Sequence, residues 1–151
     1  MKALVFSDSH GYINSIINAI KDHSDASLII HAGDVSRDVD DLLAIFPSLK
    51  IETVAGNNEF FCTLPLDRIF EFGGKRIFLT HGHKYGVKSG LERLKARATE
   101  LGADICIFGH THIRHSSQEN GTYFLNPGAA HRSFAIIEVN GEKVEIIEKE
   151  F

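Results

Sequence analysis

Carboxylate, amide and imidazole side chains recur along this sequence in five short clusters, and all three groups bind divalent metal ions. In chain order the clusters are Asp8-Ser-His10, Gly33-Asp34, Gly56-Asn57, His81-Gly-His83 and Gly109-His-Thr-His112. Polar residues two positions apart point the same way in an extended segment, so such a pair can face one metal centre. The set contains no thiolate, which favours Mn, Fe, Zn, Ni or Co over Ca or Mg and is unlike a structural zinc site.

Each cluster directly follows a segment whose apolar pattern predicts a β-strand. The five predicted strands cover residues 3–6, 28–30, 51–55, 76–80 and 105–108. In open α/β sheets, ligands bind at the edge where the carboxyl ends of the strands lie. Five polar clusters at equivalent strand ends therefore indicate one shared site.

Helical patterns separate the first three strands. Apolar residues recur at helical spacing over residues 13–20 and 39–46, and Pro47 ends the second pattern. The first third of the chain is thus predicted to be β-α-β-α-β, which implies parallel strands with right-handed crossovers.

The second half is predicted to contain a third helix and several antiparallel strands. Apolar spacing predicts a helix over residues 91–101, with Ser89 and Glu92 as a capping box and Gly102 as the stop. A strand over residues 69–72 precedes the one ending at Thr80. Hairpin turns are predicted at Gly73-Gly74, Asn120-Gly121 and Asn140-Gly141.

Composition narrows the classes of function. The chain has 151 residues, 43% hydrophobic and 24% charged, which fits one globular domain over residues 1–151. The formal net charge is -4 and the basic residues are scattered, so neither stable nucleic-acid binding nor membrane binding is expected. Only Cys62 and Cys106 are present, and no signal peptide is seen, so a cytoplasmic location is expected.

Taken in order, Asp-x-His, Gly-Asp, Gly-Asn, His-Gly-His and Gly-His-x-His form a specific signature. The series resembles the calcineurin-like metallophosphoesterase superfamily, especially its small single-domain prokaryotic branch related to YfcE. The resemblance covers nearly the whole chain, from Lys2 to the closing hairpin. It implies an α/β fold in which a two-sheet β-sandwich of mixed parallel and antiparallel strands is flanked by helices.

The resemblance also implies two divalent metal ions that share one carboxylate, with manganese favoured over iron, zinc or nickel. One metal is expected on Asp8, His10 and His112, the second on Asn57, His81 and His110, with Asp34 as the bridge. A shared carboxylate and hydroxide reduce the repulsion between cations about 3.5–4 Å apart. The hydroxide then attacks phosphorus in line with the leaving oxygen. The implied activity is therefore hydrolysis of a phosphate ester, with a phosphodiesterase favoured over a phosphomonoesterase.

The residues expected to act in catalysis beside the metals are Asn57, Asn58 and His83. Some relatives have His after the Asn of the Gly-Asn motif, where it protonates the leaving group; Asn58 cannot act as an acid in this way. The sequence therefore predicts a preference for good leaving groups, or a proton taken from His83 or water. Glu59 stands where close relatives often have Asp, and Ala129 where they often have Ser.

Several of these residues have simpler interpretations. Asp8 and Asp34 are also good helix N-caps, although capping does not explain five clusters at one edge. His31 is expected to be a hydrogen-bonded supporting group, and His131 to lie at the rim of the site. For residues 60–61, packing in the core is favoured over lining the site entrance.

Two other functions compete with hydrolysis of a small phosphorylated substrate. One is a non-catalytic scaffold, since Vps29, a eukaryotic member of the same superfamily, uses this fold mainly to bind proteins. All seven expected ligand positions nevertheless hold coordinating side chains, which favours the enzyme. The other is a nuclease, against which the short chain and scattered basic residues argue. A homodimer is left open.

Overall fold

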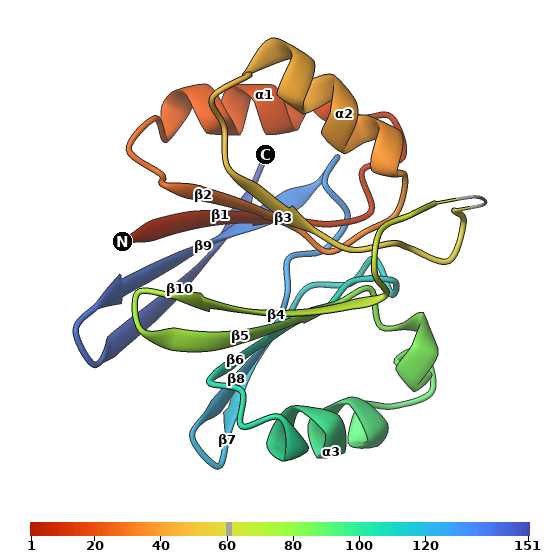
Figure 1. The fold of residues 1–151 in the computed structure, drawn as a ribbon, viewed down its shortest axis with the longest axis vertical. Coiled ribbons are helices and arrows are strands. Elements are labelled where there is room, and N and C mark those ends of the chain that lie inside the picture. The colour runs from red at the N-terminus through yellow and green to blue at the C-terminus, as the bar shows by residue number, and fades with distance from the viewer. Residues whose placement is uncertain (60–61) are drawn as a thin grey trace.

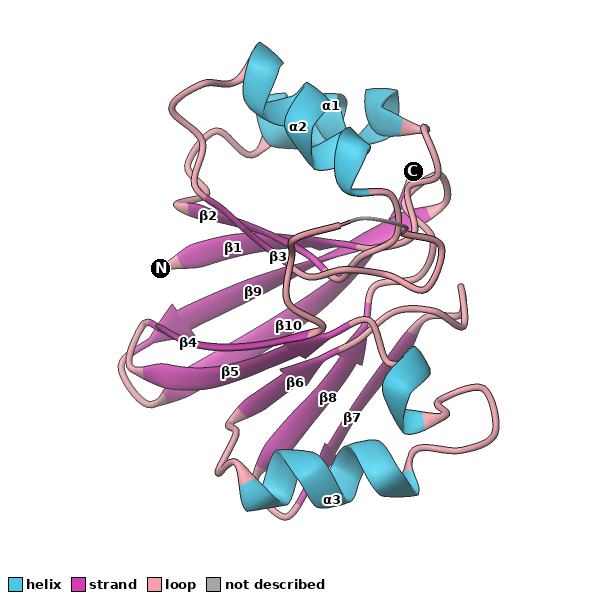
Figure 2. Ribbon diagram, turned by 45° about the vertical axis from the view of Figure 1, so that its right-hand side comes forward, coloured by secondary structure: helices cyan, strands magenta, loops and turns pink. Residues whose placement is uncertain are grey.

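Two β-sheets pack face to face in the computed structural model, which describes residues 1–59 and 62–151. Helices α1 and α2 cover the outer face of one sheet and α3 covers the outer face of the other (Figures 1 and 2). The predicted two-sheet sandwich flanked by helices is thus confirmed. The prediction for residues 60–61 falls outside the described part of the chain.

The first sheet has the strand order β10-β9-β1-β2-β3. Its elements are β1 (Lys2–Phe6), α1 (Ile13–Asp22), β2 (Leu28–His31), α2 (Ser36–Ile45), β3 (Ile51–Thr53), β9 (Ser133–Asn140) and β10 (Lys143–Glu150). Strands β1, β2 and β3 are parallel, as the β-α-β-α-β pattern predicts, while β9 runs antiparallel to β1. The chain therefore returns from the second sheet to complete the first.

The second sheet has the strand order β4-β5-β6-β8-β7. Its elements are β4 (Asp67–Phe72), β5 (Lys75–Thr80), the 3₁₀ turn η1 (His83–Tyr85), α3 (Glu92–Glu100), β6 (Ile105–Ile107), β7 (His115–Glu119) and β8 (Thr122–Asn126). Strands β5, β6 and β8 are parallel. The three predicted hairpins are confirmed, because β4–β5, β7–β8 and β9–β10 are each antiparallel pairs.

Strand β1 is apolar throughout because both of its faces are buried. Ala3 and Val5 point into the core between the sheets, while Leu4 and Phe6 pack under the helices of the first sheet. A fully buried valine, leucine or phenylalanine side chain contributes about 1.5–3 kcal/mol to folding. Burial on both faces fixes the register of β1, and with it the position of the loop that follows.

The predicted capping box of α3 is wrong. The helix begins at Glu92 after Leu91, and no side chain caps it. Gly90 has a φ of 146°, and the N–H of Ser89 bonds to the carbonyl of Gly86, so Ser89 belongs to the preceding turn rather than to the helix. Gly102 does end the helix, with a φ of 64°. Within the described residues, none of the helices combines the length and the apolar composition that a bilayer span requires.

Candidate metal centre

The loops that follow the parallel strands β1, β2 and β3 of the first sheet meet those that follow β5 and β6 of the second at one end of the sandwich. Main-chain hydrogen bonds join these loops within and between the sheets. The N–H of Asp8 donates to the carbonyl of Gly33 at 2.8 Å, and the N–H of Gly109 donates to the carbonyl of His81 at 3.0 Å. The N–H of His110 reaches across to Oδ2 of Asp8 at 3.0 Å. Residues more than 100 positions apart in sequence are thereby held together.

The backbone at this end of the sandwich is unusual. Seven residues other than glycine have a left-handed φ within the described ranges, and five of the seven are expected metal ligands. These five are Asp8 (52°), His10 (44°), Asp34 (77°), His110 (72°) and His112 (60°). Such conformations are costly for L-residues and cluster at functional sites. Neither α1 nor α2 has a side-chain N-cap, so the alternative interpretation of Asp8 and Asp34 as helix caps is wrong.

Asp8 is fully buried, and its two carboxylate oxygens have different surroundings. Oδ2 accepts hydrogen bonds from the Ser7 hydroxyl at 2.6 Å and from a main-chain N–H. Oδ1 has no hydrogen-bond partner among the described residues. Instead it faces the Nε2 atoms of His112 at 3.3 Å, His81 at 3.7 Å and His10 at 3.9 Å. A buried carboxylate oxygen surrounded by imidazole nitrogens is a suitable ligand for a cation.

His81 is also oriented for coordination. Its Nδ1 lies 2.8 Å from the carbonyl oxygen of Ala32. A carbonyl only accepts, so Nδ1 carries the proton and donates, which leaves the lone pair of a neutral ring on Nε2. That Nε2 lies 3.0 Å from Oδ1 of Asn57 and faces Oδ1 of Asp8. Three electron-rich atoms therefore converge, and a cation among them would remove their mutual repulsion.

Asp34 lies between the two expected sets of ligands. Its Oδ2 is 3.5 Å from Nε2 of His10. The carboxylate of Asp34 also lies close enough to the carboxylate of Asp8 and the ring of His81 for the three to share an ion. Asn58 holds this carboxylate from the other side, with the side-chain amide donating to Oδ2 at 2.7 Å and the main-chain N–H donating to Oδ1 at 3.2 Å. Asn58 is thus a hydrogen-bond donor to Asp34.

Two geometric groups of potential ligands emerge, and they share Asp8. One joins Asp8, His10 and His112, and the other joins Asp8, Asp34 and His81. The other two expected ligands lie beside the second group, since Asn57 is hydrogen-bonded to His81 and the ring of His110 is centred 5.1 Å from that of His81. All seven expected positions are therefore close together. Their role as ligands remains a prediction.

Imidazole coordinates metals through its neutral form, and burial favours that form here. Burial, together with the neighbouring His81, lowers the pKa of His110 to about 4. Burial likewise lowers the pKa of His83, whose ring is centred 5.5 Å from that of His81 and 6.0 Å from that of His110. His83 thus lies beside the second group of potential ligands.

A buried network supports the loop that carries Asp8. The N–H of Gly33 donates to Nδ1 of His31 at 3.2 Å, so Nε2 of a neutral ring donates to the Ser9 hydroxyl at 3.0 Å. Ser9 in turn donates to Oδ2 of Asp38 at 2.6 Å, and the same oxygen accepts the N–H of Gly11 at 2.8 Å. Burial lowers the pKa of His31 to about 4, which keeps the ring neutral. The supporting role expected for His31 is confirmed by these bonds.

Sequence reasoning missed the contributions of Ser9, Asp38 and Asn126. No short motif links the first two, which are 29 positions apart and meet only through the fold. The side-chain amide of Asn126 donates to the carbonyl of Gly109 at 3.1 Å and to the hydroxyl of Thr111 at 3.0 Å. It therefore anchors the loop of His110 and His112 to the end of β8.

Comparison with known proteins agrees with this architecture. The family model of the calcineurin-like phosphoesterase superfamily domain matches residues 1–142. A probable metallophosphoesterase from Bacillus subtilis is 36% identical over 131 residues, which cover 85% of this chain and 75% of that protein. A phosphodiesterase from Methanocaldococcus jannaschii is 29% identical over 152 residues, covering 85% of this chain and 83% of that protein.

A solved structure shares the whole fold. Vps29 from Entamoeba histolytica, determined in complex with Zn²⁺, superimposes with a TM-score of 0.80 at 23% identity and covers 99% of each chain. At that identity the likeness shows the fold alone. The family model and the B. subtilis relative together establish the predicted resemblance, and this chain belongs to the calcineurin-like phosphoesterase superfamily.

Proposed function

We propose that this protein is a phosphodiesterase that works with two divalent metal ions, with manganese favoured over iron, zinc and nickel. The single observation that carries the proposal is the environment of Asp8. A fully buried carboxylate oxygen without a hydrogen-bond partner in the described chain faces three imidazole nitrogens, an arrangement that a cation would stabilise. The name of the M. jannaschii relative supports the choice of phosphodiesters.

The residues would divide into two sets around one bridge. One set is Asp8, His10 and His112, the other is Asn57, His81 and His110, and Asp34 is the bridge. When bound, two such cations supply the charge that activates water and neutralises the phosphoryl oxygens. The chain's own contribution is rigidity, because a buried hydrogen bond from Ser7 and a partly buried one from Asn58 hold the two carboxylates in place.

Hydrolysis should be fast only for esters whose leaving group departs without being protonated. Asn58 occupies the place where some relatives have an acid, and its amide is committed to Asp34 at 2.7 Å. An amide has no proton to give near neutral pH. We therefore expect aryl phosphodiesters to be hydrolysed faster than alkyl phosphodiesters. Equal rates on both, with His83→Ala unchanged, would contradict this part of the proposal.

The test pairs metal analysis with turnover. Protein purified without metal-chelating resin is analysed for bound metals, then assayed on bis(4-nitrophenyl) phosphate with added Mn²⁺, Fe²⁺, Zn²⁺ or Ni²⁺. We expect two metals per chain and metal-dependent turnover. Asp34→Asn should lose both. His23→Gln, at the residue that directly follows α1 and belongs to neither group of potential ligands, serves as the control. No bound metal and no turnover would instead favour a non-catalytic scaffold.

A further inference from the structure

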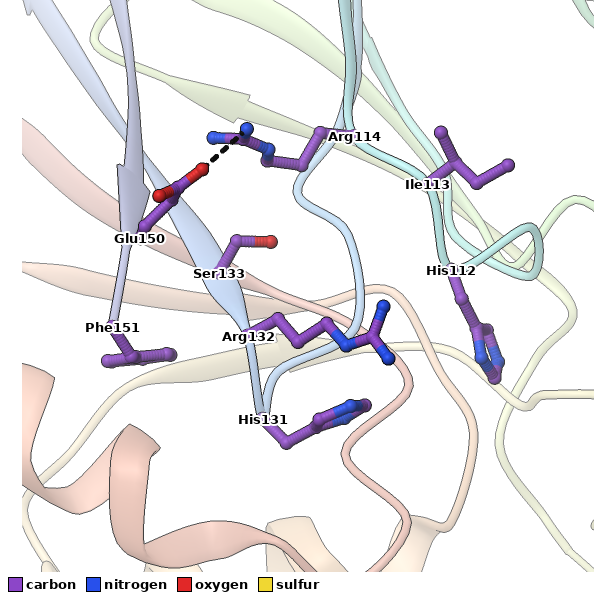
Figure 3. Close-up of a pocket in the computed structure, with 8 residues that line it drawn as sticks. All are labelled: His112, Ile113, Arg114, His131, Arg132, Ser133, Glu150 and Phe151. Carbon is purple, nitrogen blue, oxygen red and sulfur yellow. Dashed lines mark hydrogen bonds and ion pairs between the residues drawn. The ribbon is translucent and has the colours of Figure 1, made fainter.

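A cavity of about 550 Å³ adjoins the candidate metal centre. It lies between the loop after β6, the start of β9 and the end of β10, and its lining includes His112, Arg114, Arg132 and Glu150 (Figure 3). None of these residues except His112 takes part in the metal centre described above. The cavity is therefore distinct from the metal centre, and His112 borders both.

His112 links the two spaces. Its Nε2 lies 3.3 Å from the unpartnered oxygen of Asp8, while the residue also lines the cavity. A phosphodiester carries two ester groups, its two arms, on one phosphorus. With its phosphate at the metal centre, one arm of the diester can extend past His112 into this space, so the lining of the cavity would contact that arm.

The charge of the lining is unbalanced. Arg114 is paired with Glu150 at 2.8 Å, which neutralises both. Arg132 has no carboxylate within 4.0 Å of its guanidinium anywhere in residues 1–59 and 62–151. Figure 3 shows its side chain extending beside that of His131 toward the side where His112 lies. Arg132 is thus a cation of the lining without a side-chain carboxylate partner, and it extends toward the side where His112 lies.

The rim beside Arg132 is held in place. The main-chain N–H of Arg132 donates to the carbonyl of Ala129 at 2.9 Å, its carbonyl accepts the N–H of Phe151 at 3.0 Å, and the hydroxyl of Ser133 donates to the carbonyl of Pro127 at 2.7 Å. These hydrogen bonds hold the backbone at Arg132 and at Ser133 beside it. A guanidinium on a fixed base presents paired N–H donors that match a carboxylate or a phosphate.

We propose that this cavity binds a second anionic group, carried on one arm of the phosphodiester, and that Arg132 recognises it. The substrate class is then a diester with an additional phosphate or carboxylate on the arm that enters the cavity. This inference rests on the proposed phosphodiesterase function and adds to it the specificity for one arm.

The test uses three diesters that share the 4-nitrophenol leaving group. Their second arms are phenyl, 4-carboxyphenyl and 4-phosphonophenyl, so they differ only in the added anion. We expect kcat/KM to be about tenfold higher with an anionic arm, the size of one charge-assisted hydrogen-bonded contact at a solvent-accessible site. The ratio between the carboxylate and phosphonate esters tells which anion is preferred.

Arg132→Gln should lower the preference for the anionic esters over the phenyl ester to about one, and Arg132→Lys should retain part of that preference. Arg93→Gln, which removes an exposed arginine on α3, is the matched control. An unchanged preference in Arg132→Gln, or no preference in the unmodified protein, would overturn the assignment of the cavity alone. Hydrolysis of none of the three esters would overturn the proposed function and this inference with it.

Discussion

Replacing Asp8 by Asn should make the metal-free protein more stable and at the same time remove its response to metal. Asp8 is fully buried, and its Oδ1 has no hydrogen-bond partner among the described residues. The variant keeps an oxygen to accept the Ser7 hydroxyl and the main-chain N–H of His110. Its new amide group would face Nε2 of His112, now 3.3 Å from Oδ1, and could donate to it.

The size of the effect follows from the cost of an unsatisfied buried group, about 1–3 kcal/mol and more when the group is charged. We therefore expect Asp8→Asn to raise the free energy of unfolding of the metal-free protein by about 1–3 kcal/mol. For a chain of about this length, each kcal/mol raises Tm by about 2–4 °C. A metal present at 1,000 times its Kd should add about 4.1 kcal/mol to the unmodified protein, which exceeds the expected gain of the variant, and almost nothing to the variant.

The assay is thermal and urea unfolding at pH 8.5, above the usual pKa of about 6.5 for histidine, with EDTA or with Mn²⁺. The variant should be the more stable protein in EDTA and the less stable one in Mn²⁺. Asp22→Asn, which removes an exposed charge at the end of α1, should change neither order. A variant that is destabilised in EDTA, or that gains as much from Mn²⁺ as the unmodified protein, would refute the reasoning.

Three further results are expected. The buried, neutral ring of His31 has a pKa of about 4, against 6.5 in the unfolded chain. Because the unfolded chain binds more protons between these pH values, the free energy of unfolding should fall by about 3 kcal/mol as the pH drops from 6.5 to 4. His31→Gln should remove that part of the loss, measured by urea unfolding with EDTA. Gly56→Ala places a Cβ 2.6 Å from Cα of Asp34 and should lower stability by about 1–3 kcal/mol and weaken Mn²⁺ binding, whereas Gly74→Ala, with no atom within 4 Å, should leave Mn²⁺ binding unchanged. Asp38→Ala removes the acceptor of two hydrogen bonds and should weaken Mn²⁺ binding about 10–100-fold in calorimetric titration; unchanged affinity would show that this loop needs no such support.

The sequence predicted the elements of the fold well because their signals are local. Strand β1 reads as an apolar run since both faces are buried, and paired glycines mark the turn between β4 and β5. The capping box of α3 failed because the same residue types also fit a turn, and the backbone at Gly90 decides which of the two forms. Within each sheet, the proximity of the expected ligands followed from the parallel strands, while the packing of the two sheets brings the ligands of one sheet to those of the other.

Other features of the centre could not be predicted from local patterns. The bond between Ser9 and Asp38 joins two loops that meet only after β1 and β2 have paired. The amide of Asn126 reaches the His110 loop from the end of β8 by the same kind of long-range contact. The pairing state of Arg132 likewise depends on which carboxylates the fold brings near it. Such contacts are set by tertiary geometry rather than by spacing along the chain.

The left-handed conformations of the expected ligands restrict what can replace them. Glycine and asparagine adopt a φ near 60° at little cost, whereas a β-branched residue would pay roughly 1–2 kcal/mol or more at each position. In a saturation library selected only for folding, His112 (φ 60°) should therefore yield to glycine or asparagine and exclude valine and isoleucine. Proteins descended from this one that lost the activity would be expected to accumulate glycine or asparagine at these positions first, because these residues keep the loop conformation without a carboxylate or an imidazole.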